Sequence, residues 1–136
     1  MLRANAVEHH VENFDAEVAF FRDVLGCSEN MYIANTLAAF MVADNLTLLV
    51  LPRDPGHPPY TNLKGETLDI SVDLPEVDAR YERLKEKGVA IRQPPVTTPH
   101  GIRTFYFETP GGLTIEYEAA ATQDAADLLQ KLFGQG

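Results

Sequence analysis

Four acidic side chains occupy positions that can share one surface of the molecule, and they are the first candidates for chemistry: Glu8, Asp69, Asp73 and Glu116. Carboxylates that pack together raise one another's pKa and attract a cation. Such a surface suits a basic ligand, or acid–base catalysis by two carboxylates whose pKa values are tuned apart. The alternative is that some of these acids lie at strand ends in water.

Histidine, aromatic and other polar residues extend this set. His10 has the parity of Glu8, so His10, Asp69 and Glu116 form the one candidate set of metal ligands. His9 points the other way along the strand, which predicts a packed or half-exposed histidine. The remaining candidate ligand-binding residues are Phe40, Leu49, Ser71 and Arg103. For Phe40 the alternative is core packing, and for Arg103 it is an ordinary surface position.

Composition and charge limit the classes of partner. The chain has 136 residues, which suits a single domain, and its net charge is −9 with a pI near 4.8. This balance argues against nucleic acid and anionic membranes, which need a basic face. We find no apolar run of the roughly 20 residues that span a bilayer, and we expect no signal peptide because the first residues contain no apolar segment. The single cysteine fits a reducing cytoplasm.

The elements that must position these residues can be read from hydrophobic periodicity. Helical spacing predicts helices over 13–26, 75–87 and 121–133. Alternation predicts strands over 5–11, 31–33, 37–42, 68–74 and 89–91, around Val96, and over 104–107 and 113–118. The near-continuous apolar segment 46–51 predicts a central strand. A proline-rich loop over 52–65 interrupts the chain, and long loops often cover a site.

The two halves of the chain repeat one pattern of strand, helix and three strands. A shift of 63 residues places 6–11 on 69–74, and the final strands 46–51 and 113–118 both begin with Leu-Thr. We therefore expect one domain over 1–136: module one at about 4–51, a linker over 52–66, module two at about 67–119, and the C-terminal helix.

Three segments resemble the vicinal oxygen chelate superfamily, which includes glyoxalases, bleomycin-resistance proteins and extradiol dioxygenases. They are FFRDVLGC at 20–27, SVDLPEVDARYERLKEKGV at 71–89 and RTFYFETPGGLTIEY at 103–117. The resemblance implies an α+β fold in which paired βαβββ modules form a half-open barrel around a cleft. It also implies a homodimer, and it leaves the activity open because this fold hosts many functions.

The resemblance also implies where a metal would bind. Metal-dependent members hold the ion at four positions on the first and last strands of each module, which the repeat places at Ala6, Leu49, Asp69 and Glu116. Of these, Glu116 alone matches the family pattern, and Ala6 and Leu49 have no donor atom. We therefore expect a protein that binds a small, cationic natural product without a cofactor, in the manner of bleomycin-resistance proteins. The alternative is a lyase, isomerase or dioxygenase with a divalent ion at an atypical ligand set.

Overall fold

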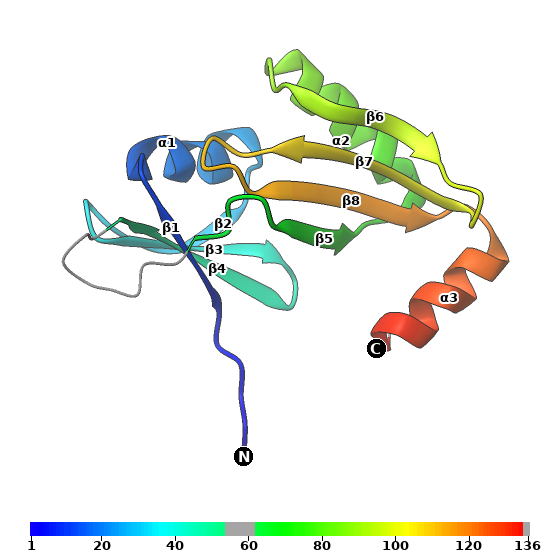
Figure 1. The fold of residues 1–136 in the computed structure, drawn as a ribbon, viewed down its shortest axis with the longest axis horizontal. Helices are drawn as coiled ribbons and strands as arrows, with labels where there is room; N and C mark the ends of the chain where they lie inside the picture. Colours follow the sequence, from blue (N-terminus) through cyan, green and yellow to red (C-terminus); the bar gives the residue numbers. More distant parts are fainter. Residues whose placement is uncertain (54–61, 135–136) are drawn as a thin grey trace. The chain divides into compact units, whose positions relative to one another are not determined.

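The computed structural model describes residues 1–53 and 62–134, which form two four-stranded sheets with helices (Figure 1). The chain divides into two compact units. The first contains Met1–Glu66 and Thr109–Leu113, and the second contains Thr67–Glu108 and Thr114–Gly136. The predicted α+β class, with its two modules of strand, helix and three strands, is confirmed. The predicted loop over 52–65 falls largely outside the described residues.

The first unit has the sheet order β1-β4-β3-β2. Its elements are β1 (Val7–Val11), α1 (Phe14–Ala19), η1 (Phe20–Val24), β2 (Ser28–Ile33), β3 (Leu37–Ala43) and β4 (Leu46–Pro52). Asn13 caps α1, because its side chain accepts a hydrogen bond from the Ala16 N–H. The apolar strand β4 lies in the interior of the sheet, as its sequence predicts. His9 is fully buried, so of the two alternatives, packed or half-exposed, the structure shows the packed one.

The second unit repeats this order with β5-β8-β7-β6. Its elements are β5 (Thr67–Ser71), α2 (Leu74–Glu86), β6 (Ile91–Thr97), β7 (Ile102–Glu108), β8 (Thr114–Ala120) and α3 (Gln123–Phe133). Helix α2 packs on one face of the sheet (Figure 1). Val77 and Leu84 are buried there, and the rings of Tyr81 and Phe105 meet edge to face. Helix α3 contacts β8.

Three predicted elements differ from the structure. The helix expected over 13–26 is α-helical only to Ala19 and continues as the π-helix η1, in which the Leu25 N–H reaches the Phe20 carbonyl. Strand β2 begins at Ser28 rather than Met31. All six of its residues are exposed, so no apolar alternation marks its start in the sequence. Strand β6 is one continuous strand with two register shifts. Its prolines are tolerated because it is an edge strand.

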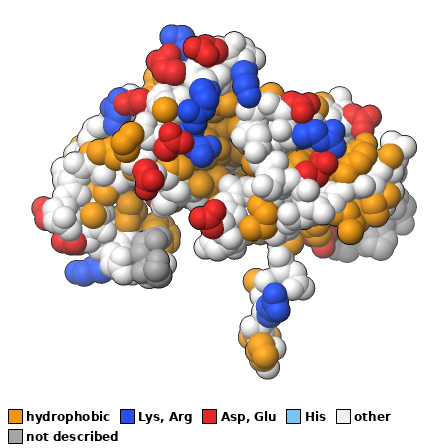
Figure 2. Space-filling model, turned by 180° about the vertical axis from the view of Figure 1, so that it is seen from behind, with side chains coloured by type: hydrophobic (Ala, Val, Ile, Leu, Met, Phe, Trp, Pro, Cys, Tyr) orange, Lys and Arg blue, Asp and Glu red, His pale blue; other side chains and the backbone are white. Residues whose placement is uncertain are grey.

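Acidic and basic side chains are interspersed on the face that Figure 2 shows. Several acidic and basic side chains form ion pairs near the surface, such as Arg103 with Asp78 and Arg22 with Glu29. Such pairs contribute little to stability. Within the described residues, no helix is long and apolar enough to cross a membrane.

Candidate functional site

Strand register brings the predicted acids of the second unit together. In the parallel pair β5 and β8, Asp69 lies opposite Glu116. In the antiparallel pair β7 and β8, Tyr106 lies opposite Glu116 and Thr104 lies opposite Glu118. Because side chains alternate along a strand and Phe105 faces α2, these polar residues all project from the face of the sheet that points away from α2.

Three carboxylates form the centre of this polar face. Ligand atoms of Asp69, Glu116 and Glu118 all lie within 4.8 Å of one another. Asp69 is exposed, Glu116 is half-buried, and Glu118 is only 6% exposed. We call these three residues the carboxylate cluster. Like charges this close destabilise one another unless a proton or another cation lies among them.

Burial, together with the crowding of these charges, favours a proton retained within the cluster. Burial, followed by the charge and hydrogen bond of Asp69 and the charge of Glu116, raises the pKa of Glu118 from 4.5 to about 8. Although the Asp69 side chain as a whole is exposed, partial burial of its carboxyl group also raises its pKa, and the hydrogen bond with Glu118 opposes this shift. At neutral pH the Asp69–Glu118 pair therefore shares one proton, which leaves through ionisation near pH 8.

Two hydroxyl groups complete the surroundings of Glu116. The Thr104 hydroxyl donates a hydrogen bond of 2.7 Å to Glu116 Oε2. Partial burial, followed by a hydrogen bond with Glu116, raises the pKa of Tyr106 above its usual value of 10. Tyr106 is thus a neutral donor whose ring borders the carboxylates. An aromatic ring beside carboxylates offers a cation both charge and π-electron density.

The first unit has a weaker counterpart of this site. In the parallel pair β1 and β4, Glu8 lies opposite Leu49, as Asp69 lies opposite Glu116 in β5 and β8. Glu8, rather than Ala6, is therefore the counterpart of Asp69, and the strands repeat after 61 residues rather than 63. His10 lies beside Glu8, with 3.8 Å between its Nε2 atom and Glu8 Oε1. Leu49, which occupies the position on β4 that Glu116 occupies on β8, has no atom that could bind a metal ion or accept a hydrogen bond from a ligand.

Other predicted site residues lie in different surroundings. Phe40 is fully buried and stacks on Phe21, so its ring belongs to the core of the first unit and not to the face that carries Leu49. Arg103 donates to Asp78 on α2, which places it on the helix side of the second sheet, away from the carboxylate cluster. Ser71 lies opposite Glu118 and is exposed, on the same face as the cluster.

Glu118 is the site residue that sequence reasoning does not select, and for Tyr106 the sequence favours core packing over an aromatic wall of the site. The alternation of the last strand already places Glu118 on the same face as Glu116. The sequence does not give the strand pairing, however, and only that pairing shows that Glu118 reaches Asp69. The pairing of β7 with β8 likewise shows that Tyr106 lies opposite Glu116, which the sequence alone does not show.

The donors of the cluster suit some cations better than others. Within the described part of the second unit, the cluster consists of carboxylates alone, and no histidine or cysteine joins it. Oxygen donors of this kind suit hard ions such as Mg²⁺ and Ca²⁺, whereas Fe²⁺, Ni²⁺ and Zn²⁺ sites usually include imidazole or thiolate. The residues present therefore do not fit the His-containing transition-metal site that the resemblance implies for metal-dependent members.

Comparisons with known proteins support the fold. The family model for the "Glyoxalase/Bleomycin resistance protein/Dioxygenase superfamily" matches residues 3–117. A glyoxalase/bleomycin resistance protein/dioxygenase from Nocardioides is 24% identical with a TM-score of 0.65, covering 88% of this chain and 85% of that chain. A lactoylglutathione lyase from Agrobacterium tumefaciens is 22% identical with a TM-score of 0.67, covering 86% and 94%. A glyoxalase/dioxygenase from Nostoc punctiforme is 22% identical with a TM-score of 0.68, covering 88% and 92%. Among curated proteins, none matches the chain significantly.

Proposed function

Because this chain belongs to the glyoxalase/bleomycin resistance protein/dioxygenase superfamily, whose members differ widely in activity, we propose its function from its own side chains. We propose that the protein binds a small organic cation at the carboxylate cluster and holds it without a resident transition metal. A basic natural product is the ligand class that we expect. The observation that carries this proposal is the convergence of three carboxylates within 4.8 Å on one sheet face.

A positively charged group would reduce the electrostatic repulsion within the carboxylate cluster. Asp69, Glu116 and Glu118 repel one another when ionised, and a retained proton offsets this only in part. An ammonium group bound among the carboxylates would replace that proton and reduce their mutual repulsion. The ring of Tyr106 would lie beside the bound cation. The net charge of −9 favours the approach of a cation from solution.

Proton and ligand would compete for the same carboxylates. Because the pKa of Glu118 is about 8, binding a cation at lower pH must release a proton. The affinity for a permanently charged ligand should therefore rise with pH, by up to about tenfold per pH unit for one released proton, and level off above pH 8.

The experiment compares two molecules of nearly equal shape, choline and 3,3-dimethylbutan-1-ol. They differ in a quaternary nitrogen in place of a carbon, so the difference in their affinity reports on charge. Titration calorimetry and NMR should show that choline binds and that Glu116→Gln weakens it at least about tenfold. Glu108→Gln is the matched control because Glu108 is an exposed acid of the same sheet, paired with Arg92. Equal binding of both molecules would overturn the proposal.

A second candidate is a site for a hard divalent ion, and the same three carboxylates favour it. Mg²⁺ or Ca²⁺ would then support a lyase or isomerase type of reaction, in which the ion acts as a Lewis acid; the dioxygenase alternative would need a redox-active ion, which this donor set does not favour. One of the similar structures is a lactoylglutathione lyase, which makes this class worth testing. Calorimetry with Mg²⁺ and Ca²⁺ distinguishes the candidates: micromolar ion binding that Glu116→Gln abolishes would favour this second function.

We also propose that the protein acts as a homodimer. Helix α3 has one buried residue, Ala125, and exposes the large apolar side chains Leu128, Leu132 and Phe133. Exposed apolar side chains that are grouped on one element are typical of an interaction surface. A second copy of the chain is the partner that the resemblance to dimeric members suggests.

A further inference from the structure

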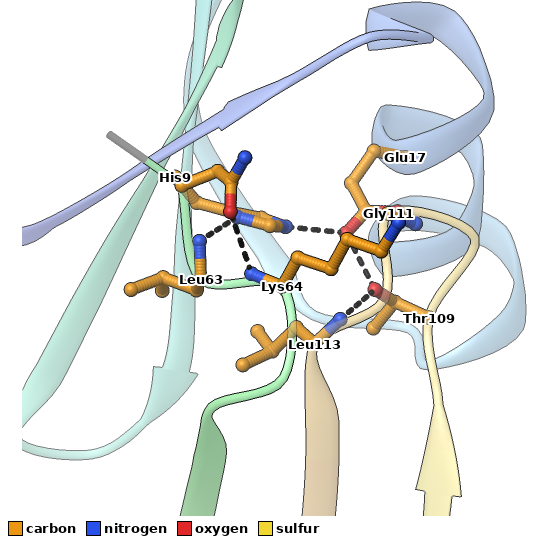
Figure 3. Close-up of polar contacts among 8 residues, drawn as sticks. His9, Glu17, Leu63, Lys64, Thr109, Gly111 and Leu113 are labelled. Carbon is orange, nitrogen blue, oxygen red and sulfur yellow. Dashed lines mark hydrogen bonds and ion pairs between the residues drawn. The ribbon is translucent and has the colours of Figure 1, made fainter. Parts of the chain in front are cut away.

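Glu17 is a fully buried carboxylate that the proposed function does not use. It lies on α1 and accepts three hydrogen bonds, all within the first unit (Figure 3). His9 Nε2 lies 2.7 Å from its Oε2 atom, and the Thr109 hydroxyl donates to the same oxygen at 2.6 Å. The Gly111 N–H donates to Oε1 at 2.7 Å. Each oxygen therefore has a donor, as a buried carboxylate requires.

His9 connects this carboxylate to a second segment. The Leu63 N–H donates to His9 Nδ1 at 3.3 Å, so the ring proton lies on Nε2 and points at Glu17. The ring is fully buried and has a partner on both nitrogen atoms. We call His9, Glu17, Thr109 and Gly111, with the Leu63 N–H, the His9–Glu17 network.

The network holds the two segments that lead into β5 and β8. The turn Thr109–Leu113 immediately precedes β8, and residues 63–65 precede β5. These segments also bond to each other, because the Gly65 N–H donates to the Gly112 carbonyl at 3.0 Å. The same separation along the chain relates Gly65 to Gly112 and Asp69 to Glu116. The bond therefore extends the register of the β5–β8 pair by two residues.

We propose that His9 and Glu17 are positioning residues for the carboxylate cluster: they fix the starts of β5 and β8 in the register that sets Asp69 opposite Glu116. A slip of one residue would send every side chain of a strand to the other face of the sheet. The inference rests on the proposed function, because that function makes the carboxylate cluster a binding site. Its test needs no ligand, so each proposal can fail without the other.

The test removes one hydroxyl from the network. Thr109→Val deletes the donor to Glu17 and the acceptor of the Leu113 N–H, whereas Thr109→Ser keeps both. Thr98→Val is the matched control, because Thr98 accepts from the Ile102 N–H in the turn between β6 and β7, at a similar distance. Two readouts are needed for each variant: amide hydrogen exchange, and the carboxyl ¹³C NMR titration of Glu118.

In Thr109→Val, we expect amide exchange at Gly111 and Leu113 to rise at least about tenfold, which reports local opening. The Glu118 midpoint should fall from about 8 as the carboxylates separate. The expected fall is about one pH unit, the typical spread of carboxyl pKa values in folded proteins. Thr109→Ser should behave as the wild type, and Thr98→Val should change exchange at Ile102 alone.

Faster exchange in Thr109→Val with an unchanged Glu118 midpoint would overturn the proposal, because the network would then stabilise only its own turn. Unchanged exchange and an unchanged midpoint would overturn it as well. If Thr109→Val does not fold, Glu17→Asp supplies the same two readouts, since it keeps the charge and withdraws the oxygens from Thr109 and Gly111.

Discussion

The protonation of Glu118 depends on its neighbours more than on its own chemistry. In water a glutamate is ionised at neutral pH, but burial and the charge of Asp69 raise the pKa of Glu118 to about 8. Glu116, one pleat away on the same strand, is half-buried and accepts from Thr104. Two glutamates on one face of β8 therefore lie in different surroundings: Glu118 is buried beside Asp69, and Glu116 accepts a hydrogen bond from the Thr104 hydroxyl.

Glu118 should make stability depend on pH. Because its pKa in the folded state is raised above the unfolded value of 4.5, the folded state binds more protons between about pH 4.5 and 8. The contribution of Glu118 to stability is therefore lost as pH rises through this window. Glu118→Gln should flatten this dependence and raise the free energy of unfolding at pH 9 by about 1–3 kcal/mol. Urea denaturation at pH 5, 7 and 9 measures this, and a wild-type slope retained in Glu118→Gln would contradict the assignment.

Asp69 should control the proton on Glu118. Asp69→Asn removes the neighbouring charge that raises the pKa of Glu118, and it leaves an amide that can donate a hydrogen bond. Carboxyl ¹³C NMR titration should show the Glu118 midpoint falling by about one unit or more. An unchanged midpoint would mean that burial alone sets it.

Among the helices and strands, those that bury one face have a regular spacing of apolar residues and can be predicted from the sequence. The continuous apolar run of β4 and the cap and apolar stripe of α1 are visible in the sequence, because burial on a regular element imposes spacing. Exposed β2 has no such spacing. Phe40 was a candidate for the ligand face, but its pairing with Leu48 puts it in the core. Strand register, which depends on contacts distant in sequence, separates these outcomes.

The turn Thr109–Leu113 shows the same limit. Its Pro-Gly-Gly composition predicts a turn, but the sequence does not show that the turn packs on Glu17. From the sequence, Glu17 is an acidic residue in the first turn of a helix, where the helix dipole stabilises a negative charge. The structure instead makes it the acceptor of three hydrogen bonds.

Gly111 should tolerate no side chain. A Cβ atom there would lie 2.8 Å from Glu17 Oε2 and 2.9 Å from Val11 Cγ1. Gly111→Ala should therefore destabilise the fold by about 1–3 kcal/mol, the usual cost of overpacking. Urea denaturation of Gly111→Ala, Glu17→Ala and the double variant tests the cause. The alanine should cost less when Glu17 is already removed, and strictly additive effects would contradict the proposed clash.

The exposed apolar side chains of α3 make self-association the property of the whole molecule that can be tested first. We expect sedimentation equilibrium to show a dimer, and Leu132→Gln to weaken it by at least about tenfold, because burying a leucine stabilises an interface by roughly 1.5–3 kcal/mol. Lys131→Gln is the matched control on the same helix. A monomer at all concentrations in the wild type would contradict the proposed dimer.

The central claim is that the carboxylate cluster binds an organic cation, and titration with choline at pH 6.5 and pH 9 tests it most directly. We predict binding that is at least about tenfold tighter at pH 9, with no binding of 3,3-dimethylbutan-1-ol and a marked loss in Glu116→Gln but not in Glu108→Gln. Choline affinity that is independent of pH and unchanged in Glu116→Gln would contradict the claim.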